Sequence, residues 1–199
     1  MKRTALILIV LVLVSGIGAV AFLKIAARGF SAREEPSAVE KFLARAARSL
    51  AVPNDVKVRQ NPEPDIPEVL AEARAHWADH CASCHANNGS GDTEMGRNLY
   101  PRAPDMRQPA TQDLTDGELF FIIENGVRLT GMPAWGAPGR QEESWKLVRF
   151  IRHLPRLSAE EEQQMLKMNP KSPAELEEEK AEEEFLRGEN PHVHEHSHH

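Results

Sequence analysis

The chain has 199 residues, which is enough for one ordinary domain with appendages and too few for two full domains. Its net charge of -6 is unevenly spread: residues 1–60 carry ten Lys/Arg and four Asp/Glu, whereas residues 158–199 carry four and twelve. Because the chain has neither an overall basic face nor a glycine-rich loop that could cradle phosphate, the sequence predicts no nucleic-acid partner.

The N-terminus has the charge and the apolar length of a membrane anchor. Lys2 and Arg3 precede an uncharged run that reaches Leu23, close to the roughly 20 residues that span a bilayer as a helix. The small residues of "AVA" at 19–21 would also suit the cleavage site of a signal peptide. We favour a transmembrane anchor over residues 1–24, because the apolar run continues past the usual length of a signal-peptide core. Either segment would export the rest of the chain.

Residues 25–60 are predicted to hold a juxtamembrane amphipathic helix and a linker. Arg45 and Arg48 lie off an apolar face that consists of Val39, Phe42, Leu43, Ala46, Ala47 and Leu50. Pro53 follows the end of this pattern. Two roles suit such a helix: packing on the main domain, which we favour, or lying on the membrane surface beside the anchor. The following "NPEPDIP" is typical of a stiff linker.

Residues 61–157 are expected to fold as one compact all-helical unit, because no stretch alternates as a strand does. "PEVLAEARAHWADHCASCH" has helical apolar spacing that leads straight into two cysteines. A loop-rich stretch with several Gly and Pro follows. "LTDGELFFIIENG" predicts a short helix that stops at Gly126. "EESWKLVRFIRHLP" predicts a last helix, ended by Pro155, with one apolar stripe of Trp145, Val148 and Ile151.

Residues 158–199 form an acidic tail of which we expect little to pack. S-x-x-E patterns at Ser158 and Ser172 are typical of helix starts, but glutamates dominate the second helix. The chain ends in "NPHVHEHSHH", a candidate site for Cu(II), Ni(II) or Zn(II) formed by His192, His194, His196, His198 and His199. The alternative is an expression tag or an unstructured tail that binds metal adventitiously.

The only two cysteines, Cys81 and Cys84, stand directly before His85 in "CASCH", which allows four kinds of chemistry. A disulfide across so short a loop would stabilise the fold least. A zinc site needs four ligands, and no second Cys or His pair lies at ligand spacing. A redox dithiol favours a strand-helix-strand setting, which this region lacks. Covalent haem uses all three residues: two thiols on the porphyrin vinyl groups and the imidazole on iron.

On "CASCH", "LTDGELFFIIENGVRLTGMPAWG" and "SWKLVRFIRHL", residues 66–156 resemble the class I c-type cytochromes. The resemblance implies a small all-α fold around one haem c, with the first and last helices crossing. Met132 is the expected second axial ligand of the iron, because it lies in a Gly/Pro-rich turn of the kind that carries this ligand in the family. Met106 is the alternative, whereas Met95 is expected to be exposed or to fill a gap. The other histidines of the domain are interpreted as bystanders, namely His76, His80 and His153.

The haem pocket is expected to be dry and apolar. Its expected lining, which an ordinary core would equally contain, consists of Trp77, Leu99, Tyr100, Phe120, Phe121, Ile123, Val127, Trp135 and Trp145. As in the family, we expect a backbone carbonyl between Pro101 and Pro104 to accept a hydrogen bond from His85.

With both axial positions filled, the iron would have no site for a substrate, so the resemblance implies a single-electron carrier rather than an enzyme. We expect the carrier to be held at the inner membrane by its N-terminal helix, with the haem domain on the periplasmic side. Its expected partners are redox proteins such as a respiratory complex, an oxidase or a dehydrogenase. An open sixth position would instead indicate a peroxidase-like enzyme, or a haem or metal sensor.

Overall fold

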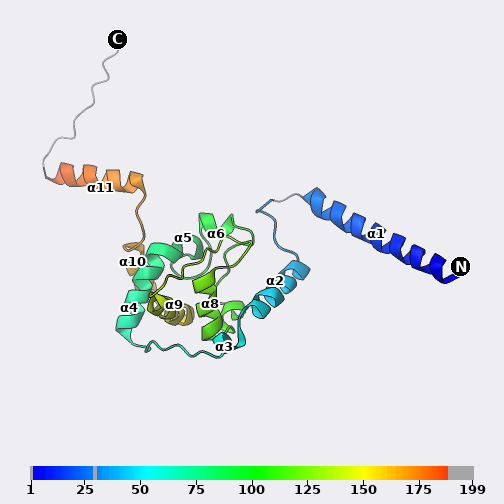
Figure 1. Ribbon diagram of the computed structural model, residues 1–199. Helices are drawn as coiled ribbons and strands as arrows, with labels where there is room; N and C mark the ends of the chain where they lie inside the picture. The colour runs from blue at the N-terminus through cyan, green and yellow to red at the C-terminus, as the bar shows by residue number, and fades with distance from the viewer. Residues whose placement is uncertain (1, 29–30, 188–199) are drawn as a thin grey trace, which may run out of the picture.

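The computed structural model describes residues 2–28 and 31–187, and within these ranges it consists of helices and loops without a β-strand (Figure 1). The predicted all-helical fold is confirmed. One long N-terminal helix stands apart from a compact group of helices that contains the two cysteines (Figure 1).

The N-terminal helix α1 (Lys2–Arg28) has the properties of a membrane span. Its segment Arg3–Ile25 has a mean hydropathy of 3.0, and none of it is buried against the rest of the protein. At about 1.5 Å of rise per residue, these 23 residues extend roughly 35 Å, which exceeds the approximately 30 Å hydrocarbon core of a bilayer. By length and composition, α1 can cross a membrane.

Two helices connect α1 to the compact group. The first, α2 (Ala38–Ala51), starts with a capping box, and the second, α3 (Asn54–Lys57), is a single turn. α3 lies against the first turn of α8 (Asp116–Asn125). At Gly117 in this turn, a Cβ atom would lie 1.8 Å from the carbonyl oxygen of Val56. Glycine therefore permits the close approach that holds α3 on the domain.

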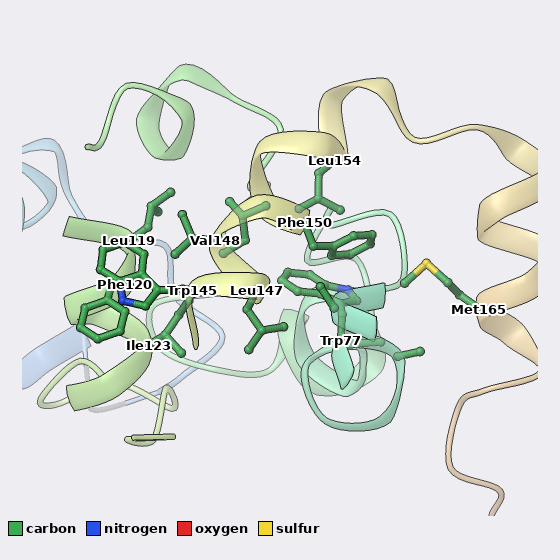
Figure 2. Close-up of a cluster of buried hydrophobic side chains, with 14 residues drawn as sticks. Trp77, Leu119, Phe120, Ile123, Trp145, Leu147, Val148, Phe150, Leu154 and Met165 are labelled. Carbon is green, nitrogen blue, oxygen red and sulfur yellow. The ribbon is translucent and has the colours of Figure 1, made fainter. Parts of the chain in front are cut away.

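The core of the domain lies between α4 (Pro67–His76), α8 and α9 (Gln141–His153), and α9 packs against both of the others. α4 and α9 are the first and last helices of the domain, and they pack on each other as the resemblance implied. Figure 2 shows the buried side chains, which include Trp77, Leu119, Phe120, Ile123, Trp145, Leu147, Val148 and Phe150. Because these apolar residues recur at helical spacing, each helix turns one stripe into the core.

Short helices fill the chain between α4 and α8. α4 continues without a break through a π-helical turn, η1 (Trp77–Cys81), into α5 (Ala82–His85). α6 (Glu94–Arg97) and α7 (Pro109–Gln112) are single turns within the loop-rich stretch that the Gly and Pro residues predict.

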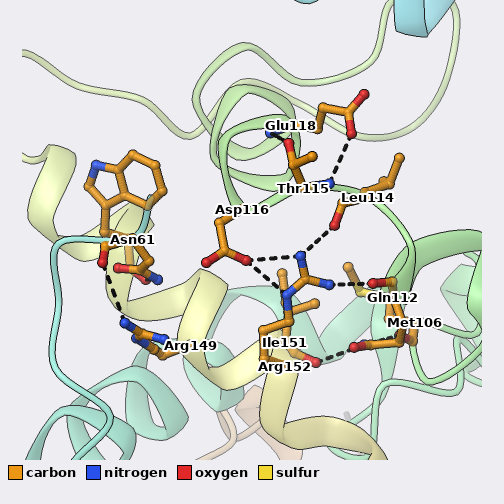
Figure 3. A network of polar contacts seen from close by, with 11 residues as sticks. Asn61, Met106, Gln112, Leu114, Thr115, Asp116, Glu118, Arg149, Ile151 and Arg152 are labelled. Atoms are coloured by element: carbon orange, nitrogen blue, oxygen red, sulfur yellow. Dashed lines mark hydrogen bonds and ion pairs between the residues drawn. The ribbon is translucent and has the colours of Figure 1, made fainter. Parts of the chain in front are cut away.

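An arginine network fixes the loops around α9 (Figure 3). The Arg152 guanidinium donates hydrogen bonds to the backbone carbonyls of Gln112 and Leu114, and it pairs with the Asp116 carboxylate at 2.9 Å. One turn earlier, Arg149 donates to two backbone carbonyls of the proline-rich linker. Charged donors thus satisfy carbonyl groups that the loops leave unpaired, which holds α7 and the linker against α9.

The helix α10 (Ala159–Leu166) packs on the domain, so the expectation that little of the tail would pack is wrong for this segment. Met165 is fully buried in the core, with an exposed fraction of 0%. The Glu161 carboxylate lies 3.0 Å from the ring of His153 and 3.4 Å from the guanidinium of Arg74. A single apolar residue and a half-buried ion pair hold α10 in place, and neither stands out among its glutamates in the sequence.

The last described helix, α11 (Pro173–Leu186), has no buried residue, which agrees with the expected solvated tail. The turn η2 (Leu154–Arg156) joins α9 to α10. The predicted metal ligands of the C-terminus lie outside the described residues, namely His192, His194, His196, His198 and His199.

Candidate functional site

The candidate site lies at the end of the continuous helix formed by α4, η1 and α5. Cys81 is the last residue of η1, and Cys84 and His85 are the last residues of α5. The two cysteines form no disulfide with each other, and both are partly exposed. Ala86 then turns the chain out of the helix with a left-handed φ of 60°. π-Helical turns inside α-helices are frequent at functional sites, so the backbone of η1 supports the choice of this region as the candidate site.

The indole of Trp77 braces this end of the helix. Its Nε1 donates a hydrogen bond to the carbonyl oxygen of Ala86 at 3.0 Å, and its ring lies 5.7 Å from the ring of His85, measured between centroids. Trp77 has an exposed fraction of only 2%. One buried side chain therefore both satisfies the carbonyl beyond the motif and excludes water from one side of the histidine.

Burial controls the protonation of the motif. Burial, with a smaller contribution from the neighbouring Cys84 thiol, raises the pKa of Cys81 to about 12. The Cys81 thiol is therefore protonated at neutral pH, which is unfavourable for a redox dithiol. Burial also lowers the pKa of His85 to about 4, so its imidazole is neutral, the form that binds a metal.

The imidazole of His85 lacks a protein partner where we expected one. Its Nδ1 is buried and has no hydrogen-bond partner, although a carbonyl between Pro101 and Pro104 was expected to accept from it. That stretch does pass beside the motif. The Gly91 N–H donates to the carbonyl oxygen of His85 at 2.9 Å, and a Cβ on Gly91 would lie 2.3 Å from the carbonyl oxygen of Ala103. The loop is thus placed next to the motif without making the predicted hydrogen bond.

Two residues that the sequence did not single out hold the loop against the cysteines. The Thr93 hydroxyl donates to the carbonyl oxygen of Ser83 at 2.7 Å and accepts from the N–H of Gly96 at 2.8 Å. Gly96 approaches so closely that a Cβ would lie 2.2 Å from the carbonyl oxygen of Cys84. The sequence "TEMG" is compatible with Thr93 as the N-cap of α6. A helix cap does not by itself indicate that the residue also contacts the cysteine motif.

The predicted ligand Met132 lies in a turn that is anchored on the C-terminal end of α8. Its carbonyl oxygen accepts from the N–H of Val127 at 3.1 Å, and its own N–H donates to the Thr130 hydroxyl at 3.1 Å. Further along, the N–H of Trp135 donates to the carbonyl oxygen of Ile123 at 3.0 Å. Met132 is partly exposed. The turn is thus fixed by backbone hydrogen bonds at both sides of the methionine.

Ring stacking brings this turn next to the helix that carries the cysteines. The indole of Trp135 stacks on the imidazole of His80, with ring centroids 5.7 Å apart and 23° between planes. On the other side, a Cβ on Gly131 would lie 2.5 Å from the side chain of Leu99. The turn containing Met132 therefore contacts both η1 and the loop after α6.

The other two methionines of the domain behave differently from each other. Met95 is 56% exposed, in agreement with the expected exposure. Met106 packs against the core, its N–H donates to the carbonyl oxygen of Gly89, and its own carbonyl accepts from Gln112. Met106 thus has a packing role of its own beside α7.

The expected pocket lining divides into three groups. Four residues are buried: Trp77, Phe120, Ile123 and Trp145. Three are partly exposed: Leu99, Phe121 and Val127. Tyr100 and Trp135 are exposed at 37% and 39%, and the Tyr100 hydroxyl donates to Glu40 on α2 rather than into the core. The expected lining residues from η1 and α9 and two of the three from α8 are therefore buried, whereas the two loop aromatics lie at the surface.

The remaining histidines of the domain have partners of their own. His76 lies 3.8 Å from the Glu143 carboxylate, and its ring is 5.0 Å from that of His80. His153 is bound by Glu161 on α10. These contacts support the interpretation of all three as bystanders to the motif.

The residues present fit a covalently bound haem. The two cysteines lie one helical turn apart without forming a disulfide, and the imidazole that follows them has a buried ring nitrogen without a partner. The buried indole of Trp77 from η1 lies beside this imidazole and in turn packs on Phe150 of α9.

Comparison with known families agrees with this chemistry. Residues 68–151 match the family model described as Cytochrome C oxidase, cbb3-type, subunit III. No curated protein matches the chain. The matched segment begins in α4, ends in α9 and includes the motif, and it covers less than half of the 199 residues. The resemblance to c-type cytochromes is thereby confirmed over residues 68–151.

Proposed function

We propose that the protein is a mono-haem electron carrier in which Cys81 and Cys84 attach haem c covalently and His85 and Met132 are the axial iron ligands. The observation that carries the proposal is the imidazole of His85, whose Nδ1 is buried and without a partner, directly after Cys81 and Cys84 in a segment that matches the family model. Haem c bound in this way supplies one-electron transfer at its iron.

The residues of the domain would influence this electron transfer by excluding water and by restraining the proposed ligand Met132. Trp77 and Trp145 are almost fully buried, so they keep water from the region around His85 and α8. The hydrogen bonds to the N–H and the carbonyl oxygen of Met132 limit the movement of its backbone. A thioether ligand and a low-dielectric pocket both favour the reduced state of iron, which suits a carrier of relatively high potential.

The proposed location is the inner membrane, with α1 as a single-pass anchor and the domain on the periplasmic side. The length and hydropathy of α1 support the anchor. The description of the matched family names an oxidase subunit, which supports redox partners in a respiratory complex. Confinement to the membrane plane would raise the rate at which the carrier meets such partners.

The optical spectrum of the purified holoprotein tests the axial ligands. We expect a low-spin spectrum in both oxidation states, no change when carbon monoxide is added to the reduced protein, and the weak long-wavelength band of sulfur-ligated ferric haem. Met132→Ala should remove that band and allow carbon monoxide to bind. Met106→Leu is the matched control and should retain the band, because Met106 packs in the core. Loss of the band in Met106→Leu with retention in Met132→Ala would reverse the assignment, and a high-spin unsubstituted protein would indicate an enzyme or a sensor.

A further inference from the structure

Helix α2 presents its apolar face to solvent. Four large apolar side chains at helical spacing are mostly exposed: Val39 at 66%, Phe42 at 70%, Leu43 at 58% and Leu50 at 86%. No residue of α2 is buried. A surface helix of a soluble protein normally turns such a face toward the core, so this orientation requires an explanation.

The opposite, polar side of α2 is the one that contacts the domain. Arg45 and Arg48 line an open surface pocket of about 270 Å³, whose other wall is formed by α7, α8 and the residues between them, including Asp113 and Glu118. At the N-terminal end of the helix, Glu40 accepts a hydrogen bond from the Tyr100 hydroxyl at 3.0 Å. Contacts from its polar side therefore hold α2 with its apolar face directed away from the protein.

The position of α2 in the chain keeps it close to any bilayer that α1 enters. The apolar segment of α1 ends at Ile25 and α2 begins at Ala38, which leaves the twelve residues 26–37 between them. Even fully extended, a connection of this length reaches only about 40 Å.

We propose that α2 lies in the membrane–water interface, with Val39, Phe42, Leu43 and Leu50 among the lipids and its basic side against the domain. The bilayer thus takes the place that a protein core takes for an ordinary amphipathic helix. α1 and α2 together would then fix the orientation of the domain, since α2 is attached to it at Tyr100 and through α3. This inference rests on the insertion of α1 and does not depend on the iron ligands.

The proposed placement of α2 would also determine which side of the candidate site lies near the membrane. Tyr100 belongs to the loop that contacts the Met132 turn through Leu99 and passes beside Gly91 next to the motif. Because the same loop is bound to α2, this side of the candidate site would be held near the lipid surface. Partners embedded in the membrane would reach that side first.

Spin labels on the full-length protein, reconstituted in vesicles that contain anionic phospholipid, test this placement. Phe42→Cys and Leu50→Cys report on the apolar face, and Ala44→Cys on the opposite side is the matched control. Relaxation by oxygen, which concentrates in lipid, is compared with relaxation by a water-soluble nickel chelate. We expect the labels at 42 and 50 to be several-fold more accessible to oxygen than to the chelate, and the label at 44 to show the reverse.

Three results would overturn the proposal. Equal access of the chelate to positions 42, 44 and 50 would place the apolar face in water. Protection of positions 42 and 50 from both reagents would place it against protein, such as a second copy of the chain. A water-exposed label in Leu13→Cys would show that α1 is not inserted, which removes the basis of the inference. The unsubstituted chain, labelled in parallel, separates this test from the haem proposal, because labelling of Cys81 or Cys84 would show that these thiols are free.

Discussion

The packing of α10 on the helical domain can be tested by Met165→Ala. Met165 has an exposed fraction of 0% and extends from α10 into the core on the side of Trp77 (Figure 2). Truncation of a fully buried methionine to alanine costs about 2–5 kcal/mol, because the lost contacts leave a cavity. We expect about 3 kcal/mol here, since the ion pair of Glu161 with Arg74 and His153 limits the collapse of α10 onto the gap.

Urea unfolding of the holoprotein, followed by circular dichroism, measures this loss. With an m-value of about 2 kcal/mol/M, a loss of 3 kcal/mol lowers the midpoint by roughly 1.5 M. Met168→Ala is the matched control, because Met168 is 40% exposed and undergoes the same chemical change three residues away. Its free energy of unfolding should stay within about 0.5 kcal/mol of the unsubstituted protein. Equal midpoints for Met165→Ala and the unsubstituted protein would refute the packing of α10.

Three further changes test the surroundings of the motif. Trp77→Phe removes the hydrogen bond to the Ala86 carbonyl and should lower the free energy of unfolding by about 1–2 kcal/mol, measured by the same urea titration. Gly96→Ala places a Cβ 2.2 Å from the Cys84 carbonyl oxygen, so we expect a loss of about 1–3 kcal/mol together with a shifted haem spectrum; an unchanged protein would contradict this close approach. The hydrogen bond from Arg107 lowers the pKa of Asp105 from 3.8 to about 2. Because the pKa is lower in the folded state than in the unfolded state, this contact stabilises the protein above about pH 4. That stability is lost as the pH falls toward 2. Asp105→Asn should therefore lower the urea midpoint near neutral pH and have little effect near about pH 2, and an equal loss at both values would contradict the contact.

The fold was largely predictable because its signals are local. The apolar stripe of α9, the stop at Gly126 and the Gly/Pro-rich loop each follow from spacing and backbone preference, and the structure has them where expected. The orientation of α2 was not predictable, because its periodicity reveals an apolar face without showing what that face contacts. The packing of α10 was not predictable for a similar reason, since Met165 and the exposed Leu166 are the only large apolar residues of this short, acidic helix.

The residues proposed to bind haem could be grouped from the sequence alone, whereas their supporting contacts could not. Cys81, Cys84 and His85 lie within five consecutive residues, so no tertiary information was needed to group them. The contacts of Thr93 and Gly96 with the motif depend on the path of a variable loop, which no local pattern encodes. The hydrogen bond expected at the Nδ1 of His85 is not formed, although the loop that should provide it passes beside Gly91.

Intact-protein mass spectrometry of the denatured chain tests covalent haem most directly. After expression in cells that mature c-type cytochromes, the protein should retain the mass of exactly one haem in denaturant, and an alkylating reagent should add nothing to Cys81 or Cys84. A Cys81→Ser/Cys84→Ser variant should lose the haem on denaturation. A denatured chain that has the mass of the polypeptide alone and takes up two alkyl groups would contradict covalent haem, and with it the proposed electron carrier.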